Sequence, residues 1–168
     1  MFMRKCLCIA IIAAMLSFGS AALAGSDLGQ SNALRTAISY LSFTAFSYEG
    51  LIDQLEYEQY THDEAIYAAD NCGADWNEQA VIKAKSYLEF SAFSYDGLVE
   101  QLKFEGFTAG QAAFGAEQCN ADWEEQAAKK AKSYLEFASF SRSGLIEQLE
   151  FEGFTQDQAV YGAEANGY

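Results

Sequence analysis

The segment YLSFTAFS at residues 40–47 decides how this chain folds, because it is one of three copies. It returns as YLEFSAFS at 87–94 and as YLEFASFS at 134–141, which sets a period of 47 residues. A unit of this size buries its apolar face mainly against its neighbours, so tandem copies form an array of similar surfaces. Such arrays bind more often than they catalyse.

Working outward from this segment, the chain divides into three copies behind a short N-terminal part. The copies are residues 31–74, 75–121 and 122–168. The chain has no proline, and no long alternation of apolar and polar residues interrupts the copies, which favours helices over strands. We therefore predict an all-α fold of three tandem helical repeats, with three helices in each.

The first helix of copies two and three begins at an Asp-Trp pair. Asp75 is the predicted N-cap, and Glu78 completes a capping box. Asp122 and Glu125 repeat this pattern in copy three. If the helix continues to Phe93, it is about 27 Å long. We expect this long helix to act also as the connector between copies, with the tryptophans packing the copies together.

Two shorter helices follow in each copy and are joined by a tight turn. The second helix starts at a serine N-cap and carries two core leucines one turn apart. A glycine ends it at Gly106 and Gly153, where copy one has Gln59. A threonine caps the third helix, so that the pair forms a helix-turn-helix-like corner. The capping and core residues are Ser47, Leu51, Leu55 and Thr61, then Ser94, Leu98, Leu102 and Thr108, then Ser141, Leu145, Leu149 and Thr155.

Residues 1–24 have the features of a secretory signal peptide. A basic start is followed by an apolar run and by small residues that end in Ala24. Cleavage between Ala24 and Gly25 would export the chain to the periplasm, the cell surface or the medium, with 25–30 as a short flexible leader. The alternative is that the segment stays as an uncleaved membrane anchor.

The exported part is strongly acidic. All 24 acidic residues follow the signal, against 8 of the 10 basic ones, so its formal charge is 8 minus 24, or −16. This charge repels the phosphates of nucleic acids and attracts basic protein partners. DNA binding is therefore excluded in spite of the helix-turn-helix-like corner.

The cysteines and the histidine do not form a pattern typical of a metal site or a catalytic site. Cys72 and Cys119 stand at equivalent positions of adjacent copies, and they either form a disulfide or stay apart as free or intermolecular thiols. His62 is the only histidine and has no counterpart in the other copies. We therefore predict no metal site, no cofactor and no catalytic residue, and the capping serines have no repeated base to activate them.

The recurring pattern Phe-Ser-x-x-Gly-Leu-x-x-Gln-Leu-x-x-Glu-Gly-Phe-Thr, together with the Asp-Trp link, resembles the repeat of the Ltp family. These are host cell surface-exposed lipoproteins encoded by prophages and some bacterial genomes, and the resemblance covers residues 33–168. It implies superinfection exclusion, in which the protein blocks DNA entry of an incoming phage by engaging its tape-measure protein. Family members carry a lipid-modified cysteine at the mature N-terminus, and none stands at Ala24-Gly25.

An acidic stripe follows the second helices. On the first of them, carboxylates at i, i+4 and i+7 share one face opposite the leucines. A solvated helix face is the simple interpretation, but its recurrence in three copies favours a surface for a basic partner segment. The predicted stripe consists of Glu49, Asp53, Glu56, Asp96, Glu100, Glu147, Glu150 and Glu152.

Taken together, the sequence predicts an exported acidic binding protein of the cell envelope. The leading function is phage superinfection exclusion. The alternative is an envelope structural or adhesion module that binds a host protein or a wall polymer.

Overall fold

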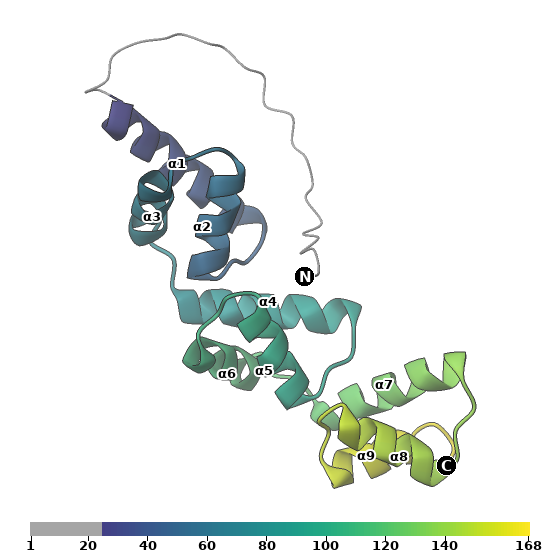
Figure 1. Ribbon diagram of the computed structural model, residues 1–168. Coiled ribbons are helices and arrows are strands. Elements are labelled where there is room, and N and C mark those ends of the chain that lie inside the picture. The colour runs from purple at the N-terminus through teal and green to yellow at the C-terminus, as the bar shows by residue number, and fades with distance from the viewer. Residues whose placement is uncertain (1–24) are drawn as a thin grey trace.

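The computed structural model describes residues 25–168. The predicted signal peptide, its cleavage site after Ala24 and the missing lipid-attachment cysteine therefore lie outside or at the edge of the described residues. Within residues 25–168 the chain forms nine helices and no strand, and none of these helices is long and apolar enough to cross a membrane. Figure 1 shows these helices gathered into successive units that follow one another diagonally.

Each copy contains a first helix and two shorter ones, as the sequence predicts. The helices are α1 (Gly25–Phe43), α2 (Tyr48–Tyr57) and α3 (His62–Asn71) in copy one, α4 (Trp76–Phe90), α5 (Tyr95–Phe104) and α6 (Ala109–Gln118) in copy two, and α7 (Trp123–Phe137), α8 (Arg142–Phe151) and α9 (Gln156–Glu164) in copy three.

The predicted caps are confirmed, with one change in where the capping boxes lie. The Asp75 carboxylate accepts the backbone N–H groups of Asn77 and Glu78, and Asp122 acts in the same way at α7. Full capping boxes form instead at the third helices, where Thr61 and Glu64 bond to each other's backbone. The same arrangement joins Thr108 to Gln111 and Thr155 to Gln158. A neutral threonine does not repel the returning side chain, whereas Asp75 and Glu78 carry like charges.

The expectation of a flexible leader at residues 25–30 is wrong. These residues form the first turns of α1, which is 19 residues long and packs along α3. Gly29 faces α3, because a Cβ atom there would lie 1.7 Å from Oε1 of Glu64, whose side chain would have to move aside. The leader is helical because α3 gives it a surface to pack on.

The predicted connector helix also needs correction. α4 ends at Phe90 rather than near Phe93, because the residues up to the Ser94 N-cap are extended. It packs chiefly on α6 of its own copy, as α1 packs on α3 and α7 on α9. Gly115 lets α6 approach closely, since a Cβ there would lie 2.8 Å from the Ala80 carbonyl oxygen. The first helix therefore belongs to its repeat, and a short link joins the copies.

Each copy has a hydrophobic core of its own, and the next copy helps to cover it. The two leucines of every second helix are fully buried, which stabilises each copy by about 1.5–3 kcal/mol per leucine. Trp76 packs on the core of copy one and contacts Tyr48 edge to face at 5.5 Å. Trp123 packs on the core of copy two and contacts Tyr95 at 5.7 Å. The predicted role of the tryptophans in packing copies together is confirmed.

Candidate functional site

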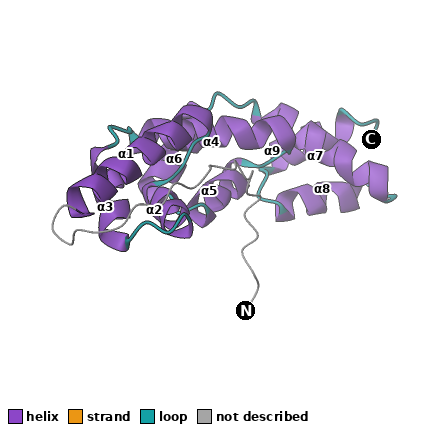
Figure 2. Cartoon of the chain, turned by 90° about the horizontal axis from the view of Figure 1, so that it is seen from above, coloured by secondary structure: helices purple, strands orange, loops and turns teal. Residues whose placement is uncertain are grey.

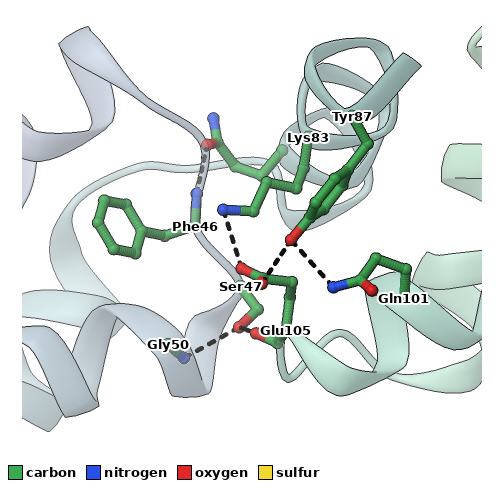
Figure 3. Close-up of polar contacts among 8 residues, drawn as sticks. Phe46, Ser47, Gly50, Lys83, Tyr87, Gln101 and Glu105 are labelled. Atoms are coloured by element: carbon green, nitrogen blue, oxygen red, sulfur yellow. Dashed lines mark hydrogen bonds and ion pairs between the residues drawn. The ribbon is translucent and has the colours of Figure 1, made fainter. Parts of the chain in front are cut away.

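The second helices of successive copies meet end to end. At the start of α2, the Ser47 hydroxyl accepts the N–H of Gly50 and donates to the backbone carbonyl of Glu105 at the end of α5, at 2.6 Å (Figure 3). Ser94 at the start of α5 donates to the Glu152 carbonyl at the end of α8, also at 2.6 Å. Both serines are only 1% exposed. We call the resulting series α8, α5 and α2 the helix column.

Glycines make the junctions of the helix column possible. Gly106 and Gly153 have φ +90°, which disfavours any side chain. A Cβ atom at either position would also lie 2.8 Å from Oγ of the preceding copy's serine. Gly50 gives room from the other side, because its Cβ would lie 3.4 Å from the Glu105 carbonyl oxygen. At this glycine it is the backbone of the next copy that approaches closely.

A polar network braces each corner behind the helix column. Tyr87 donates to Oε1 of Glu105 at 2.5 Å and accepts from Nε2 of Gln101 at 3.1 Å. Lys83 forms an ion pair with the other Glu105 oxygen at 2.9 Å (Figure 3). The repeated glutamine makes the same hydrogen bond to a tyrosine hydroxyl in all three copies. The corresponding residues are Tyr40, Gln54 and Glu58 in copy one, and Tyr134, Gln148, Glu152 and Lys130 in copy three.

The network fixes the charge of Glu152. Burial raises the pKa of this carboxyl, but hydrogen bonds from Tyr134 and Lys130 and the charge of Lys130 lower it by more, so the net pKa lies below the ordinary value. Burial and the neighbouring Glu152 raise the pKa of Tyr134. At neutral pH the pair is therefore a carboxylate that accepts a hydrogen bond from a neutral phenol.

Glu152 consequently does not belong to the predicted acidic stripe. Its side chain is half-buried in the corner network, and it corresponds in register to Glu58 and Glu105 rather than to Glu56. The other stripe residues are exposed on α2, α5 and α8. They are Glu49, Asp53, Glu56, Asp96, Glu100, Glu147 and Glu150.

The junctions bring stripe residues of one copy beside the turn of the next. The Cβ of Glu49 lies 3.4 Å from the position that a Cβ at Gly106 would take, and Asp96 lies in the same way beside Gly153. The first stripe residue of α2 thus lies beside the turn that follows α5. Figure 2 shows α2, α5 and α8 following one another along the same side of the array.

Two side chains near the stripe contact its carboxylates. Lys103 forms an ion pair with Glu100 at 2.8 Å, and Nδ1 of His62 lies 2.6 Å from Glu56. Neither residue recurs in another copy. Because Lys103 stands where copies one and three have Glu56 and Glu150, the stripe carries less negative charge in copy two.

The sequence analysis missed a set of exposed aromatic side chains on the same helices. Tyr57, Phe104 and Phe151 are 70%, 69% and 86% exposed. They occupy the last position of α2, α5 and α8. A signal was present in the sequence, since an aromatic residue recurs at a position that does not follow the leucine spacing of the core.

The two cysteines within residues 25–168 are free thiols in different copies. Cys72 packs against the core of copy one and Cys119 lies in the core of copy two. Burial raises the pKa of the Cys119 thiol. Of the two alternatives left open by the sequence, the structure has the free thiols. Among the described residues, no group of three or more His, Cys, Asp or Glu side chains is placed to hold a metal ion.

Comparison with known proteins agrees with this architecture. The family described as host cell surface-exposed lipoprotein, Ltp, matches three times, at residues 29–72, 75–118 and 122–165. No curated protein matches the chain. A solved structure, that of Ltp, a superinfection exclusion protein from the Streptococcus thermophilus temperate phage TP-J34, is 34% identical with a TM-score of 0.51. The match covers 94% of that chain and 54% of this one, a share that corresponds to about two of the three repeats. The chain therefore belongs to the Ltp family of host cell surface-exposed lipoproteins and carries three copies of the family's repeat.

Proposed function

We propose that this protein is exported to the cell envelope and acts in phage superinfection exclusion, with the helix column as its binding surface. The partner is a basic segment of a protein of the incoming phage, for which the tape-measure protein is our candidate. Binding would block injection of the phage DNA. The related Ltp of phage TP-J34 is a superinfection exclusion protein, and this likeness supports the proposal.

The observation that carries the proposal is the continuity of the acidic stripe. Because α8, α5 and α2 meet end to end, seven exposed carboxylates from three copies lie along one series of helices. A surface of one charge sign speeds the encounter with an oppositely charged partner and fixes its register. It also repels nucleic acid, so the proposal concerns a protein partner rather than the phage DNA itself.

The first helices, in contrast, carry no excess of negative charge. Six of the eight basic residues after position 24 lie on α1, α4 and α7, where they balance the acidic ones. Those six are Arg35, Lys83, Lys85, Lys129, Lys130 and Lys132. The attraction for a basic segment is thus concentrated on the remaining helices, which include the helix column.

A phage challenge tests the function directly. Cells that express the protein are exposed to a phage panel, and adsorption is measured separately from DNA entry. We expect normal adsorption and failed DNA entry for at least one phage. An envelope defect without any phage phenotype would favour the alternative, a structural or adhesion module.

Charge reversal tests the surface. The variant carries Asp53→Lys, Glu100→Lys and Glu147→Lys, one change in each copy, and should lose protection. Its control reverses one exposed carboxylate on each first helix, with Asp27→Lys, Glu89→Lys and Glu136→Lys, and should keep protection because its net charge changes equally. Full protection by the column variant would contradict the proposed role of the acidic stripe.

A further inference from the structure

The aromatic side chains at the ends of the second helices have no role in the core. Tyr57, Phe104 and Phe151 belong to none of the three core clusters and do not pack against them. Single exposed apolar residues are common on proteins. Here the same position is aromatic and exposed in each of three copies, and a carboxylate stands four residues before it each time, which is not so for the equally exposed Phe43, Phe90 and Phe137.

Each of these aromatics shares a helix face with a carboxylate. The pairs are four residues apart, a spacing that places two side chains side by side on a helix. They are Asp53 with Tyr57, Glu100 with Phe104, and Glu147 with Phe151. An aromatic ring beside a carboxylate suits a lysine or arginine side chain, because the ring attracts the cation and covers its apolar stem while the carboxylate pairs with its charge.

The same repeat already holds lysines in this way elsewhere. Lys83 pairs with Glu105 while its ammonium lies 5.9 Å from the ring centres of Phe46 and Tyr87. Lys130 repeats this arrangement in copy three with Glu152 and Tyr134. On the helix column itself, Lys103 sits on Glu100 and directly precedes Phe104 in the chain. It shows that the carboxylate of such a pair accepts a lysine.

We propose that these three aromatic–carboxylate pairs are equivalent binding units for lysine or arginine side chains of an amphipathic partner segment. The inference rests on the proposed function and deepens it, since it adds apolar contacts to the charge attraction. Because the units recur along connected helices, the partner gains from engaging several of them at once. Its cationic side chains therefore have to recur with apolar side chains beside them.

A second copy of this chain is a poor occupant of the same surface. The exposed carboxylates of the helix column would face those of the other copy, and like charges in contact disfavour association. A basic segment meets no such repulsion. The charge of the column therefore selects a cationic partner rather than self-association.

The test uses the full chain and two synthetic peptides. One is an amphipathic helix of lysine and leucine, and the other is an oligolysine of equal charge. The variant carries Tyr57→Ala, Phe104→Ala and Phe151→Ala. The matched control carries Phe43→Ala, Phe90→Ala and Phe137→Ala, which remove three aromatics that are 81–88% exposed on the first helices. Affinities are measured by calorimetry at fixed, low salt.

We expect the wild type to bind the lysine–leucine peptide more tightly than the oligolysine. Each lost ring should cost about twofold to fivefold in affinity, so the column variant should lose on the order of tenfold or more. The control should stay within about twofold of the wild type. An unchanged affinity in the column variant would overturn the inference, and so would equal losses in both variants.

Two further measurements separate this inference from the proposed function. If sedimentation shows a self-associated wild type whose association only the column variant loses, the rings serve a second copy and the inference is wrong. In the phage challenge, the variant with Tyr57→Ala, Phe104→Ala and Phe151→Ala is compared with the charge-reversed variant. If the alanine variant protects cells fully and the charge-reversed variant does not, this inference is wrong and the proposed function stands. Full protection by both variants would sink the proposed function as well.

Discussion

Copies two and three are close in sequence, yet the same serine has opposite surroundings in them. Ser94 is buried and donates to the carbonyl of Glu152 in the next copy. Ser141 is exposed, and its hydroxyl lies 3.3 Å from that of Ser143 in its own copy. Both serines cap their helix, but only Ser94 also binds a neighbour. The repeat therefore encodes a helix cap and an interface with one residue, and the interface depends on the adjoining copy.

The residue after the serine also has different surroundings in copies two and three. Tyr95 contacts Trp123 of the next copy, whereas copy three has Arg142, which forms an ion pair with Glu164 at 2.9 Å. An aromatic residue suits a face that another repeat covers, and a charged one suits a face in contact with water. The sequence of copy three thus suits a face in contact with water at this point.

The largest loss of stability should come from a substitution in the turn at Gly153, which packs against Ser94. Gly153→Ala puts a side chain at φ +90° and brings its Cβ to 2.8 Å from the serine Oγ. We expect the free energy of unfolding to fall by about 3 kcal/mol. Gly110→Ala is the control, since no atom lies within 4 Å of that Cβ position, and it should change stability by less than about 1 kcal/mol. Urea denaturation measures both, and equal effects would refute the close junction.

A smaller loss of stability should distinguish Ser94 from Ser141. Ser94→Ala removes a cap and leaves the Glu152 carbonyl buried without its partner, which should cost about 2 kcal/mol. Ser141→Ala removes only a cap on an exposed helix end and should cost at most about 1 kcal/mol. Thermal and urea denaturation of both variants give the comparison. If Ser141→Ala cost as much as Ser94→Ala, the bond across the junction would contribute nothing.

Much of this fold follows from local signals in the sequence. Serine, threonine and aspartate at fixed places in the period are effective N-caps, and leucines one turn apart can only point to one side of a helix. These signals are local, so they hold whatever the rest of the chain does. The packing of the tryptophan after each aspartate could also be predicted from the sequence. A large apolar side chain at a link between copies has only the preceding core to cover it.

The missed features depend on contacts between distant segments. That residues 25–30 are helical depends on the packing of α1 along α3, because glycine alone does not favour a helix. The bond from Ser47 to the Glu105 carbonyl involves a backbone group, which no residue type reveals. The misplacement of Glu152 was avoidable, since strict alignment of the copies pairs it with Glu105 rather than with Glu56.

The contribution of the corner network of copy three to stability should decrease at acidic pH. The pKa of Glu152 is lowered in the folded protein, so its ionised form stabilises the fold. That stability is complete above the ordinary glutamate pKa of about 4.3 and is lost as the pH falls through the lowered value. Glu152→Gln should therefore be less stable than the wild type at pH 7, with a difference that shrinks below about pH 4. Urea midpoints between pH 7 and pH 3 measure this.

The control for the acid experiment is Glu147→Gln, which changes an exposed carboxylate on the same helix. It should differ little from the wild type across the whole range, because its side chain lies outside the corner network. A Glu152 variant whose deficit stayed constant down to pH 3 would show that the ionised carboxylate does not stabilise the corner.

The smallest change in peptide affinity should come from exchanging one residue between the binding units of copies two and three. Lys103 occupies Glu100 in copy two, whereas copy three has Glu150 at the equivalent position. Lys103→Glu frees that carboxylate and adds a second one, so binding of a lysine–leucine peptide should tighten by about twofold to fivefold. Glu150→Lys makes the reverse change in copy three and should weaken binding by a similar factor. Both variants exchange residues that the repeat already accepts at this position, so folding should be unaffected. If both changes left the affinity unaltered, the partner would not approach this face of the second helices, and the acidic stripe would be a solvated surface.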